Sequence, residues 1–465
     1  RGPLRPVAAQ VRVARPTPFA SASSSDPPPP SMNRAEGDVL LTFVPGLRSL
    51  RHDRVAAVTQ PVEMLASTHL HELCAVNPDR RPGSPGNDVA TGYVAAALRD
   101  AGWTVTEQTF DVLDWSGSPG TVRVGREQWP AHPSPYARGA EMPGRLVVAR
   151  TADDLPGDLR GRVLLLLDEL AAEQLTPLGY PFYGSDDHAA LLARLMDAAP
   201  RVVLAGTGTA PQTAGALEPF PLIEDGAFPI PTANLRVDDA EALAAHAGSS
   251  VRVQISAHRW PSRARNVLAR VGNERRRVVL TAHVDSKPGT PGALDNASGV
   301  VTLLLVASEL RSRIHAAALA EVGVEIAMLN GEDYYSAPGE VAYLEACSDT
   351  LGEVVLAVNL DAAGYRVGKT AFSLYGVDVG VADVVRDCLS ASARLVEGEQ
   401  WYASDHMVFA QQGVPAVALT TDQLDVVLRE VVHSSHDLPA QVDATLLVEQ
   451  ARALLGLVDT LIQRG

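Results

Sequence analysis

Cysteine and lysine are both scarce in this chain of 465 residues, and the shortage of cysteine excludes one class of protein. The three cysteines, Cys74, Cys347 and Cys388, are too few and too scattered for a disulfide framework, and none of them forms a Cys-x-x-Cys pair. We interpret them as buried, reduced side chains. Lys287 and Lys369 are the only lysines, which we interpret as a compositional bias without a function of its own.

The chain also lacks clustered positive charge and long apolar runs. Its 39 Lys and Arg against 55 Asp and Glu give a formal net charge of −16, and no basic cluster offers a footprint for DNA or RNA. The longest apolar runs, such as 300–306, are far shorter than the roughly 20 residues that span a bilayer. We therefore expect no nucleic-acid partner and no membrane partner.

Residues 1–35 contain no hydrophobic segment of the kind found in a signal peptide, and their serine and proline runs predict disorder. Met32 is a candidate initiator within this stretch. The missing signal favours a cytoplasmic location, although a secreted chain that has lost its signal peptide would show the same sequence.

The chain has the composition of an ordinary globular protein, with 46% apolar and 20% charged residues. Its length predicts at least two domains. Helical periodicity over 55–73 and 90–101 is followed by an alternating strand pattern over 104–112. Short apolar runs broken by Gly and Pro fill 116–261, and they predict a smaller, strand-rich insert with few long helices.

From residue 264 onward, strand patterns alternate with helical ones. The strands are expected at 277–282, 324–329, 354–360 and 416–420, and a closing helix at 444–462. This alternation predicts an α/β fold, a mostly parallel mixed sheet sandwiched by helices. We therefore divide the chain into a disordered segment (1–35), a main domain (36–115 and 262–465) and an insert (116–261).

The segment 283–299, HVDSKPGTPGALDNASG, has the residue types of a metal site. His283 ends an apolar run, and Asp295 begins the turn into a helix. Further on, Glu332-Asp333 and Asp361 each follow a predicted strand, and His433 lies in a polar loop after the strand at 416–420. Because loops that leave the carboxyl ends of strands in an open α/β sheet converge on one crevice, we expect these side chains to meet.

Imidazole and carboxylate are the ligands that zinc takes at catalytic sites. The candidates supply two histidines and three carboxylates as metal ligands, with one carboxylate to spare: His283, Asp295, Asp333, Asp361 and His433. Two ions about 3.5–4 Å apart need a bridging ligand. We interpret Asp295 as that bridge.

Two further carboxylates have roles beside the ions. Asp285 is placed to accept the imidazole N–H of His283 and fix its tautomer. Glu332 would stay free of metal and act as the general base. His436 is the alternative to His433 as a ligand, and the segment Ser404-Asp405-His406 is interpreted as structural support, because neighbours in an extended segment point to opposite faces.

In order and spacing, six segments resemble the co-catalytic zinc peptidase family that includes bacterial aminopeptidases, glutamate carboxypeptidases, glutaminyl cyclases and the inactive transferrin receptors. They are His283-Val-Asp285, Pro291 to Gly299, Gly331-Glu-Asp333, Asn359-Leu-Asp361, Ser404-Asp-His406 and His433 through Asp437 to Asp443. The resemblance covers 264–465 closely and 54–115 more loosely. The insert resembles the protease-associated domain that such enzymes often carry.

The resemblance implies two zinc ions per chain, one held by His283 and Asp361 and the other by Asp333 and His433. Asp295 would bridge the ions, and Glu332 would be the base. The family more often has Glu at the position of Asp333.

The family's aminopeptidases commonly place a tyrosine just before the last histidine, where this chain has Val432. Tyr334, Tyr335 and Tyr402 are candidates to replace it. The expected function is that of a zinc-dependent metallopeptidase acting on a peptide or amide substrate, most simply an aminopeptidase.

Three rival functions remain open at the level of sequence. A carboxypeptidase, a dipeptidase or an N-acyl amide hydrolase would use the same site. A glutaminyl cyclase is less favoured because the full two-metal set is present, and a receptor-like binding protein would have lost ligands. The insert either shapes the pocket, mediates a homodimer or is an accessory lobe.

Overall fold

The computed structural model describes residues 61–76, 79–209 and 214–464. The expectations for 1–35 lie outside these residues, as does the first part of the helix predicted over 55–73. The described helices are α1 (Val62–Cys74), α2 (Pro85–Asp100), α3 (Asp186–Ala198), α4 (Val237–Ala244), α5 (Ser298–Arg313), α6 (Ala316–Glu321), α7 (Pro338–Cys347), α8 (Val379–Leu389), α9 (His406–Ala410), α10 (Leu424–Glu430) and α11 (Ala444–Arg464).

The strands form one continuous sheet in the order β1-β2-β6-β5-β4-β3-β7-β9-β8-β10-β13-β11-β12, and β1 also pairs with β7. Their bounds are β1 (Thr104–Val124), β2 (Glu127–Pro133), β3 (Ala140–Ala149), β4 (Arg162–Leu166), β5 (Val202–Thr207), β6 (Thr232–Arg236), β7 (Ser250–Val271), β8 (Arg277–His283), β9 (Gly323–Leu329), β10 (Val354–Leu360), β11 (Thr370–Tyr375), β12 (Leu395–Glu397) and β13 (Ala416–Thr421).

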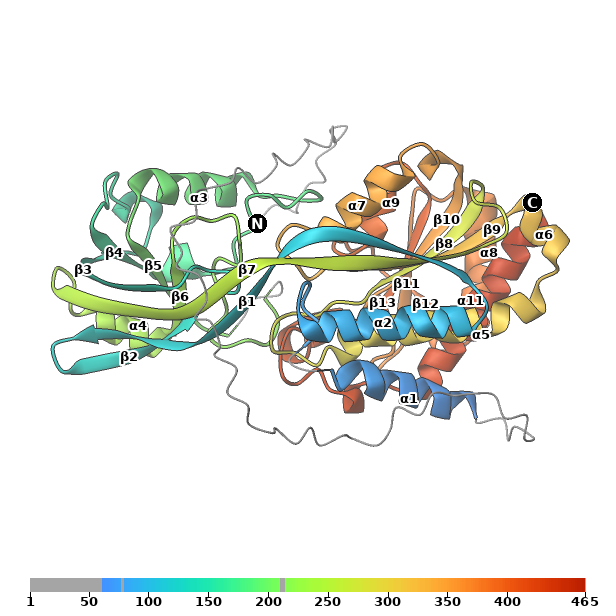
Figure 1. The fold of residues 1–465 in the computed structure, drawn as a ribbon, viewed down its shortest axis with the longest axis horizontal. Helices are drawn as coiled ribbons and strands as arrows, with labels where there is room; N and C mark the ends of the chain where they lie inside the picture. The colour runs from blue at the N-terminus through green and yellow to red at the C-terminus, as the bar shows by residue number, and fades with distance from the viewer. Residues whose placement is uncertain (1–60, 77–78, 210–213, 465) are drawn as a thin grey trace, which may run out of the picture. The chain divides into compact units, whose positions relative to one another are not determined.

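Two long strands connect the main part of the sheet to the insert. β1 and β7 pair antiparallel from Thr104↔Arg270 to Arg123↔Arg252, and Figure 1 shows them running side by side between the two groups of strands. The strand expected at 104–112 therefore continues far beyond its predicted end. The boundaries proposed at 115/116 and 261/262 lie within these strands, so the division into domains stays a prediction.

The part of the sheet that carries the predicted ligands matches the expected fold class. β9, β8, β10 and β13 are parallel neighbours, while β7 and β11 run antiparallel at either side of them. The predicted mixed, mostly parallel sheet between helices is confirmed. The segment β11–α8–β12 extends its far edge and was not expected from the sequence.

Helices cover both faces of this sheet and enclose two separate cores. One core packs α1, α2, α5, α8 and α11 against one face. The other packs α7 and α9 against the opposite face. The turn and helix over 293–313 are long and apolar enough to cross a membrane by composition, but 89% of the most apolar window is buried inside the protein, so this is a core helix.

The insert contains more helix than its sequence predicted. β3, β4, β5 and β6 are parallel neighbours, and α3 and α4 accompany them. α3 was missed, although Ser185 caps it by accepting a hydrogen bond from the His188 N–H, and Leu192, Leu195 and Ala198 are buried along one side. The prediction of few helices was wrong here because the Gly and Pro residues between the short apolar runs were taken to exclude helices over the whole insert.

The start of α2 also differs from its prediction. The helix expected over 90–101 begins earlier, at Pro85, with Ser84 as its cap, and the Ser84 side chain accepts from the Asn87 N–H. Proline is well suited to the first helical position because no backbone N–H is needed there.

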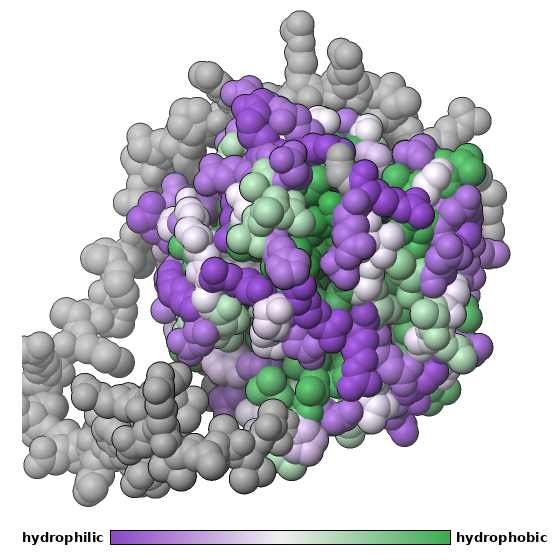
Figure 2. All heavy atoms as spheres, turned by 90° about the vertical axis from the view of Figure 1, so that its right-hand side faces the viewer, coloured by the Kyte–Doolittle hydropathy of each residue, from purple (hydrophilic) through white to green (hydrophobic). Residues whose placement is uncertain are grey.

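On the outer face that Figure 2 shows, hydrophilic side chains predominate and smaller hydrophobic areas lie between them.

Candidate metal centre

The predicted ligands lie at the carboxyl ends of three neighbouring parallel strands. His283 is the last residue of β8, Glu332 and Asp333 lie shortly after β9, and Asp361 directly follows β10. Parallel pairing aligns these ends, with His283 opposite Leu329 of β9. His433 approaches from the turn after α10, in a left-handed backbone conformation with φ of +57°.

Four side chains converge around Asp295. His283 Nε2 lies 3.1 Å from Asp295 Oδ1 and 3.5 Å from Asp361 Oδ1. His433 Nε2 lies 3.0 Å from Asp295 Oδ2 and 3.1 Å from Asp333 Oδ1. Each oxygen of Asp295 thus faces a different histidine, one next to Asp361 and the other next to Asp333.

The polar atoms of this cluster fit metal ions better than they fit one another. Ligand atoms of His283, Asp295 and Asp333 lie within 4.8 Å of one another, as do those of His283, Glu332 and Asp361. His283 is fully buried, and among the described residues neither of its ring nitrogens nor Asp333 Oδ2 has a hydrogen-bond partner. Because buried polar groups are normally satisfied, such a set of nitrogen and carboxylate donors is suited to divalent cations.

Electrostatics within the cluster show the same demand for positive charge. Burial alone would lower the pKa of His283, but the carboxylates of Asp361, Asp285 and Asp295 outweigh it and hold that pKa well above its ordinary value. Burial alone would likewise raise the pKa of Asp295, but the two histidines lower it below its usual range.

The turn that carries Asp295 is held by Arg80, a fully buried residue that the sequence analysis did not single out. Arg80 Nε donates to Val284 O at 2.8 Å, and Arg80 Nη2 donates to Gly292 O at 2.7 Å. Gly292 has a φ of +61°, and a Cβ there would lie 2.6 Å from Asp295 O, so glycine is required.

Asp437 orients Asp295 from the other side. Its two oxygens accept the backbone N–H groups of Leu294 at 2.6 Å and Asp295 at 3.0 Å. Burial, together with the charge of Asp295, raises the pKa of Asp437 to about 7. Asp437 lies in one of the segments that resemble the family pattern, but its sequence position alone gives no sign of this role.

Asp285 has a different partner from the one expected. Its Oδ1 is 3.6 Å from His283 Nδ1, which is too long for a hydrogen bond. Instead, Asp285 accepts the N–H groups of Gly331 at 2.8 Å and Asp333 at 3.0 Å. It therefore positions the turn that presents Glu332 and Asp333, because backbone donors of that turn lie closer to it than the imidazole does.

Glu332 lies beside the cluster, partly exposed, with its carboxylate among those near His283 and Asp361. Burial raises the pKa of Glu332 well above its ordinary value, although the charge of His283 opposes this effect. Behind it lie two buried acids, Glu340 and Asp405, whose carboxylate oxygens have no hydrogen-bond partner among the described residues. Sequence patterns could not identify Glu340, which lies in the first turn of α7.

The segment Ser404-Asp405-His406 does not form a relay in the described structure. Ser404 Oγ accepts a hydrogen bond from Asn359 Nδ2 at 2.8 Å, and His406 Nε2 bonds to Trp401 O at 2.9 Å. Burial lowers the pKa of His406 to about 4. These contacts agree with the supporting role expected for the segment.

Two alternatives from the sequence are decided by geometry. His436 is exposed and its Nδ1 contacts Glu430 O at 3.2 Å, so His433 and not His436 joins the cluster. Of the tyrosines considered in place of Val432, Tyr334 bonds to the backbone of Leu113. Tyr402 is 47% exposed and its hydroxyl contacts Gln400 Oε1.

The insert reaches the cluster at several points. Ala216 N donates to Val432 O at 3.1 Å, and a Cβ on Gly215 would lie 2.4 Å from the Cβ of His433. A second loop is anchored by Phe182, which packs into the core around α7 and α9 while its carbonyl accepts from the Gln411 side chain. The insert therefore supplies part of the wall around the predicted ligands.

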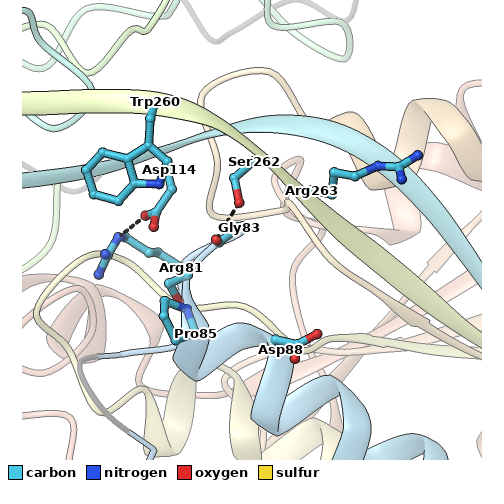
Figure 3. Close-up of a pocket in the computed structure, with 9 residues that line it drawn as sticks. Arg81, Gly83, Pro85, Asp88, Asp114, Trp260, Ser262 and Arg263 are labelled. Atoms are coloured by element: carbon cyan, nitrogen blue, oxygen red, sulfur yellow. Dashed lines mark hydrogen bonds and ion pairs between the residues drawn. The ribbon is translucent and has the colours of Figure 1, made fainter. Parts of the chain in front are cut away.

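A separate cavity lies between the start of α2 and the long strands β1 and β7 (Figure 3). Arg81 Nε donates to Asp114 Oδ1 at 2.9 Å there, and Ser262 Oγ donates to Gly83 O at 2.7 Å. None of the predicted ligands lines this cavity, so its position does not change the placement of the metal centre. Its lining consists of Arg81, Gly83, Ser84, Pro85, Asp88, Asp114, Trp260, Ser262 and Arg263.

Two curated proteins match parts of the chain. The "Probable lipoprotein aminopeptidase LpqL" of Mycobacterium tuberculosis is 25% identical over 319 residues, which are 65% of this chain and 59% of that protein. The "probable leucine aminopeptidase 2" of Aspergillus oryzae is 25% identical over 259 residues, which are 52% of this chain and 48% of that protein. The chain thus spans about half to three-fifths of the length of these relatives.

Solved structures share the fold over most of the chain. An aminopeptidase from Aneurinibacillus sp. strain AM-1 has a TM-score of 0.65 at 18% identity, covering 85% of this chain and 92% of its own. BSAP, a zinc aminopeptidase from Bacillus subtilis, has a TM-score of 0.65 at 17% identity, covering 86% of this chain and 94% of its own. At these identities the likeness concerns the fold.

The family model of peptidase family M28 matches residues 266–458, the segment that contains all five predicted ligands and Glu332. The order of the motifs, the strands that carry them and their convergence agree with this match. Residues 266–458 of this chain are therefore similar to the catalytic segment described by the model of peptidase family M28.

Proposed function

We propose that this chain is a zinc-dependent aminopeptidase that binds two zinc ions. The single observation that carries the proposal is the position of Asp295, whose two oxygens lie 3.1 Å from His283 Nε2 and 3.0 Å from His433 Nε2. A carboxylate with one oxygen directed to each of two neighbouring donor sets is suited to bridge two ions. His283 and Asp361 would hold one ion, and Asp333 and His433 the other.

Two zinc ions in this place would polarise the scissile carbonyl and lower the pKa of a bound water toward neutrality. The chain's own residues would handle the proton. Glu332 accepts the proton of the attacking water on its carboxylate and later gives it to the nitrogen of the departing amine. The water oxygen forms the new bond to the carbonyl carbon, the C–N bond breaks, and Glu332 is left ionised as at the start.

The surroundings of Glu332 suit this role. The residue is partly exposed, whereas the predicted ligands Asp333 and His283 are buried. Asp285 fixes the turn by accepting from the N–H groups on both sides of the Glu332 residue, so the turn holds Glu332 in a defined position. The low-polarity setting strengthens its basicity toward a nearby proton.

A free α-amino group on the substrate would meet the acidic border of this centre, and this favours removal of N-terminal residues over other cleavages. Both curated relatives and both solved structures bear the name of an aminopeptidase, which agrees with this choice. A carboxypeptidase or an N-acyl amide hydrolase on the same site would instead act on peptides whose amino group is blocked.

The test uses zinc-loaded protein and three matched peptides: one with a free amine, one blocked at the N-terminus and one blocked at the C-terminus. We expect cleavage of the first and third only. Bound zinc, measured by elemental analysis, should reach two per chain. Cleavage of the N-blocked peptide at an equal rate would contradict an aminopeptidase, and one zinc or none would contradict the bridged pair.

Glu332→Gln tests the base. This variant should bind zinc normally and lose at least about 10²-fold in kcat, the usual size of a general-base contribution. Glu345→Gln is the matched control, because Glu345 is an exposed residue of α7 outside the cluster. Near-normal turnover by the Glu332 variant would refute the assignment.

A further inference from the structure

Lys287 lies where the metal centre meets the insert, in a chain with only one other lysine. Its ammonium is 3.2 Å from Glu224 Oε1, and the side chains of the two residues are 16% and 5% exposed. Glu224 belongs to the insert, where Gln174 Nε2 donates to its other oxygen, Oε2, at 3.1 Å. The insert therefore holds the Lys287 ammonium in a defined place.

The loop that carries Lys287 is tied to the turn that carries Glu332. Asp285, two residues before Lys287, accepts the N–H groups of Gly331 and Asp333. Burial alone would lower the pKa of Lys287, but the charges of Glu224, Asp333 and Glu332 outweigh it and raise that pKa above its ordinary value. The ion pair with Glu224 therefore fixes the ammonium in a loop that is hydrogen-bonded to the turn of the proposed base.

The ammonium has bonding capacity left for a substrate. A lysine ammonium carries three N–H donors. Among the described residues, the Glu224 carboxylate is its one hydrogen-bond acceptor. A positive charge here repels a substrate amine and attracts a substrate anion.

We propose that Lys287 recognises a carboxylate on the residue that follows the scissile bond. This inference rests on the proposed aminopeptidase function and adds the substrate class to it. In a dipeptide, the C-terminal carboxylate is separated from the scissile carbonyl carbon only by the amide nitrogen and one Cα atom. An acidic side chain on the same residue offers the same chemistry from a slightly greater distance.

The experiment compares three substrates of zinc-loaded protein: Leu-Ala, Leu-Ala amide and Leu-Glu amide. Lys287→Met removes the charge and keeps the length of the side chain. We expect it to lower kcat/KM for Leu-Ala about tenfold, mainly through KM, because the loss of one hydrogen bond between charged groups has about this effect. Leu-Ala amide should change less than twofold.

Lys369→Met is the matched control, because it removes the other lysine, which is exposed. It should leave all three substrates unchanged. Leu-Glu amide carries a side-chain carboxylate but no C-terminal carboxylate. If Lys287→Met lowers kcat/KM for this substrate too, Lys287 recognises an acidic side chain as well as the C-terminus. Zinc content and the thermal midpoint are measured for each variant.

Lys287→Met leaves Glu224 buried without its partner, so the double variant Lys287→Met/Glu224→Gln is made beside it. The same selective loss of the free carboxylate is expected in the double variant. An equal loss for Leu-Ala and its amide would show that Lys287 only holds the insert and would overturn the proposal, as would no change at all. If wild-type protein with two zinc ions cleaves none of the three peptides, the proposed function itself fails.

Discussion

Replacement of Asp437 by Asn tests whether this residue, which touches no predicted substrate position, controls the metal centre through Asp295. Asp437 is fully buried and uses both carboxylate oxygens, accepting from Leu294 N at 2.6 Å and Asp295 N at 3.0 Å. An amide of the same shape has one oxygen and one NH2 group. One of the two backbone N–H groups would therefore face another donor.

The magnitude follows from the number of bonds lost. A hydrogen bond to a charged group contributes about 1.5–3 kcal/mol, and a buried N–H left without an acceptor costs a similar amount. If the loss falls on Asp295, zinc binding should weaken by about 1.5–3 kcal/mol, which is roughly 10- to 150-fold in affinity. Part of the loss will appear as lower stability, because Leu294 is in the protein core.

The assay is a competition between the protein and a chelator of known zinc affinity, with thermal unfolding of the zinc-free protein alongside. Asp387→Asn is the control, because Asp387 is an exposed acid on α8. We expect the control to bind zinc like the wild type. An Asp437 variant that folds normally and binds zinc within about threefold of wild type would refute the reasoning.

Three further perturbations have expected outcomes. Gly215→Ala places a Cβ 2.4 Å from the Cβ of His433 at a φ of +69°, so this variant should bind zinc more weakly and be less stable than wild type. Gly352→Ala is the control, because a Cβ there has no atom within 4 Å, and it should leave zinc affinity and the thermal midpoint unchanged. Arg80→Met removes the donor to four backbone carbonyls, three of them buried, and should lower the free energy of unfolding by about 3 kcal/mol or more in urea. A loss below about 1 kcal/mol would contradict this. Burial alone would lower the pKa of His433, but Asp333 and Asp295 raise it to about 10. Protonated His433 should therefore stabilise the zinc-free protein fully below pH 6.5, and this contribution should disappear as the pH rises through about 10. Zinc affinity should rise over the same pH range, because zinc binding displaces the proton from His433. Zinc affinity that stays flat with pH would exclude this linkage.

Much of the fold was readable from the sequence because strand and helix periods are local properties. The strand predicted at 354–360 has the same bounds in the structure, and the helix predicted from 444 begins there. The candidate ligands were found because they follow apolar strands in an order that few other arrangements explain. The end of β1 was not predicted, because strand ends depend on neighbours elsewhere in the chain. The helix α3 was missed because the Gly and Pro residues between the apolar runs of the insert received too much weight, although its cap and its buried side are local signals.

The sequence by itself determined which residue types occupy the strand ends, and therefore the α/β fold class and the identity of the predicted ligands. Only the tertiary structure decided how these residues are used. It separated His433 from His436, turned Asp285 toward the backbone of the Glu332 turn and gave Asp437 and Arg80 their contacts with the Asp295 turn. It also brought Glu224 of the insert to Lys287, which the sequence analysis had dismissed as a matter of composition. The physical reason is that hydrogen-bond partners and charges act through distance in space, and residues such as 224 and 287 are close only after the chain has folded.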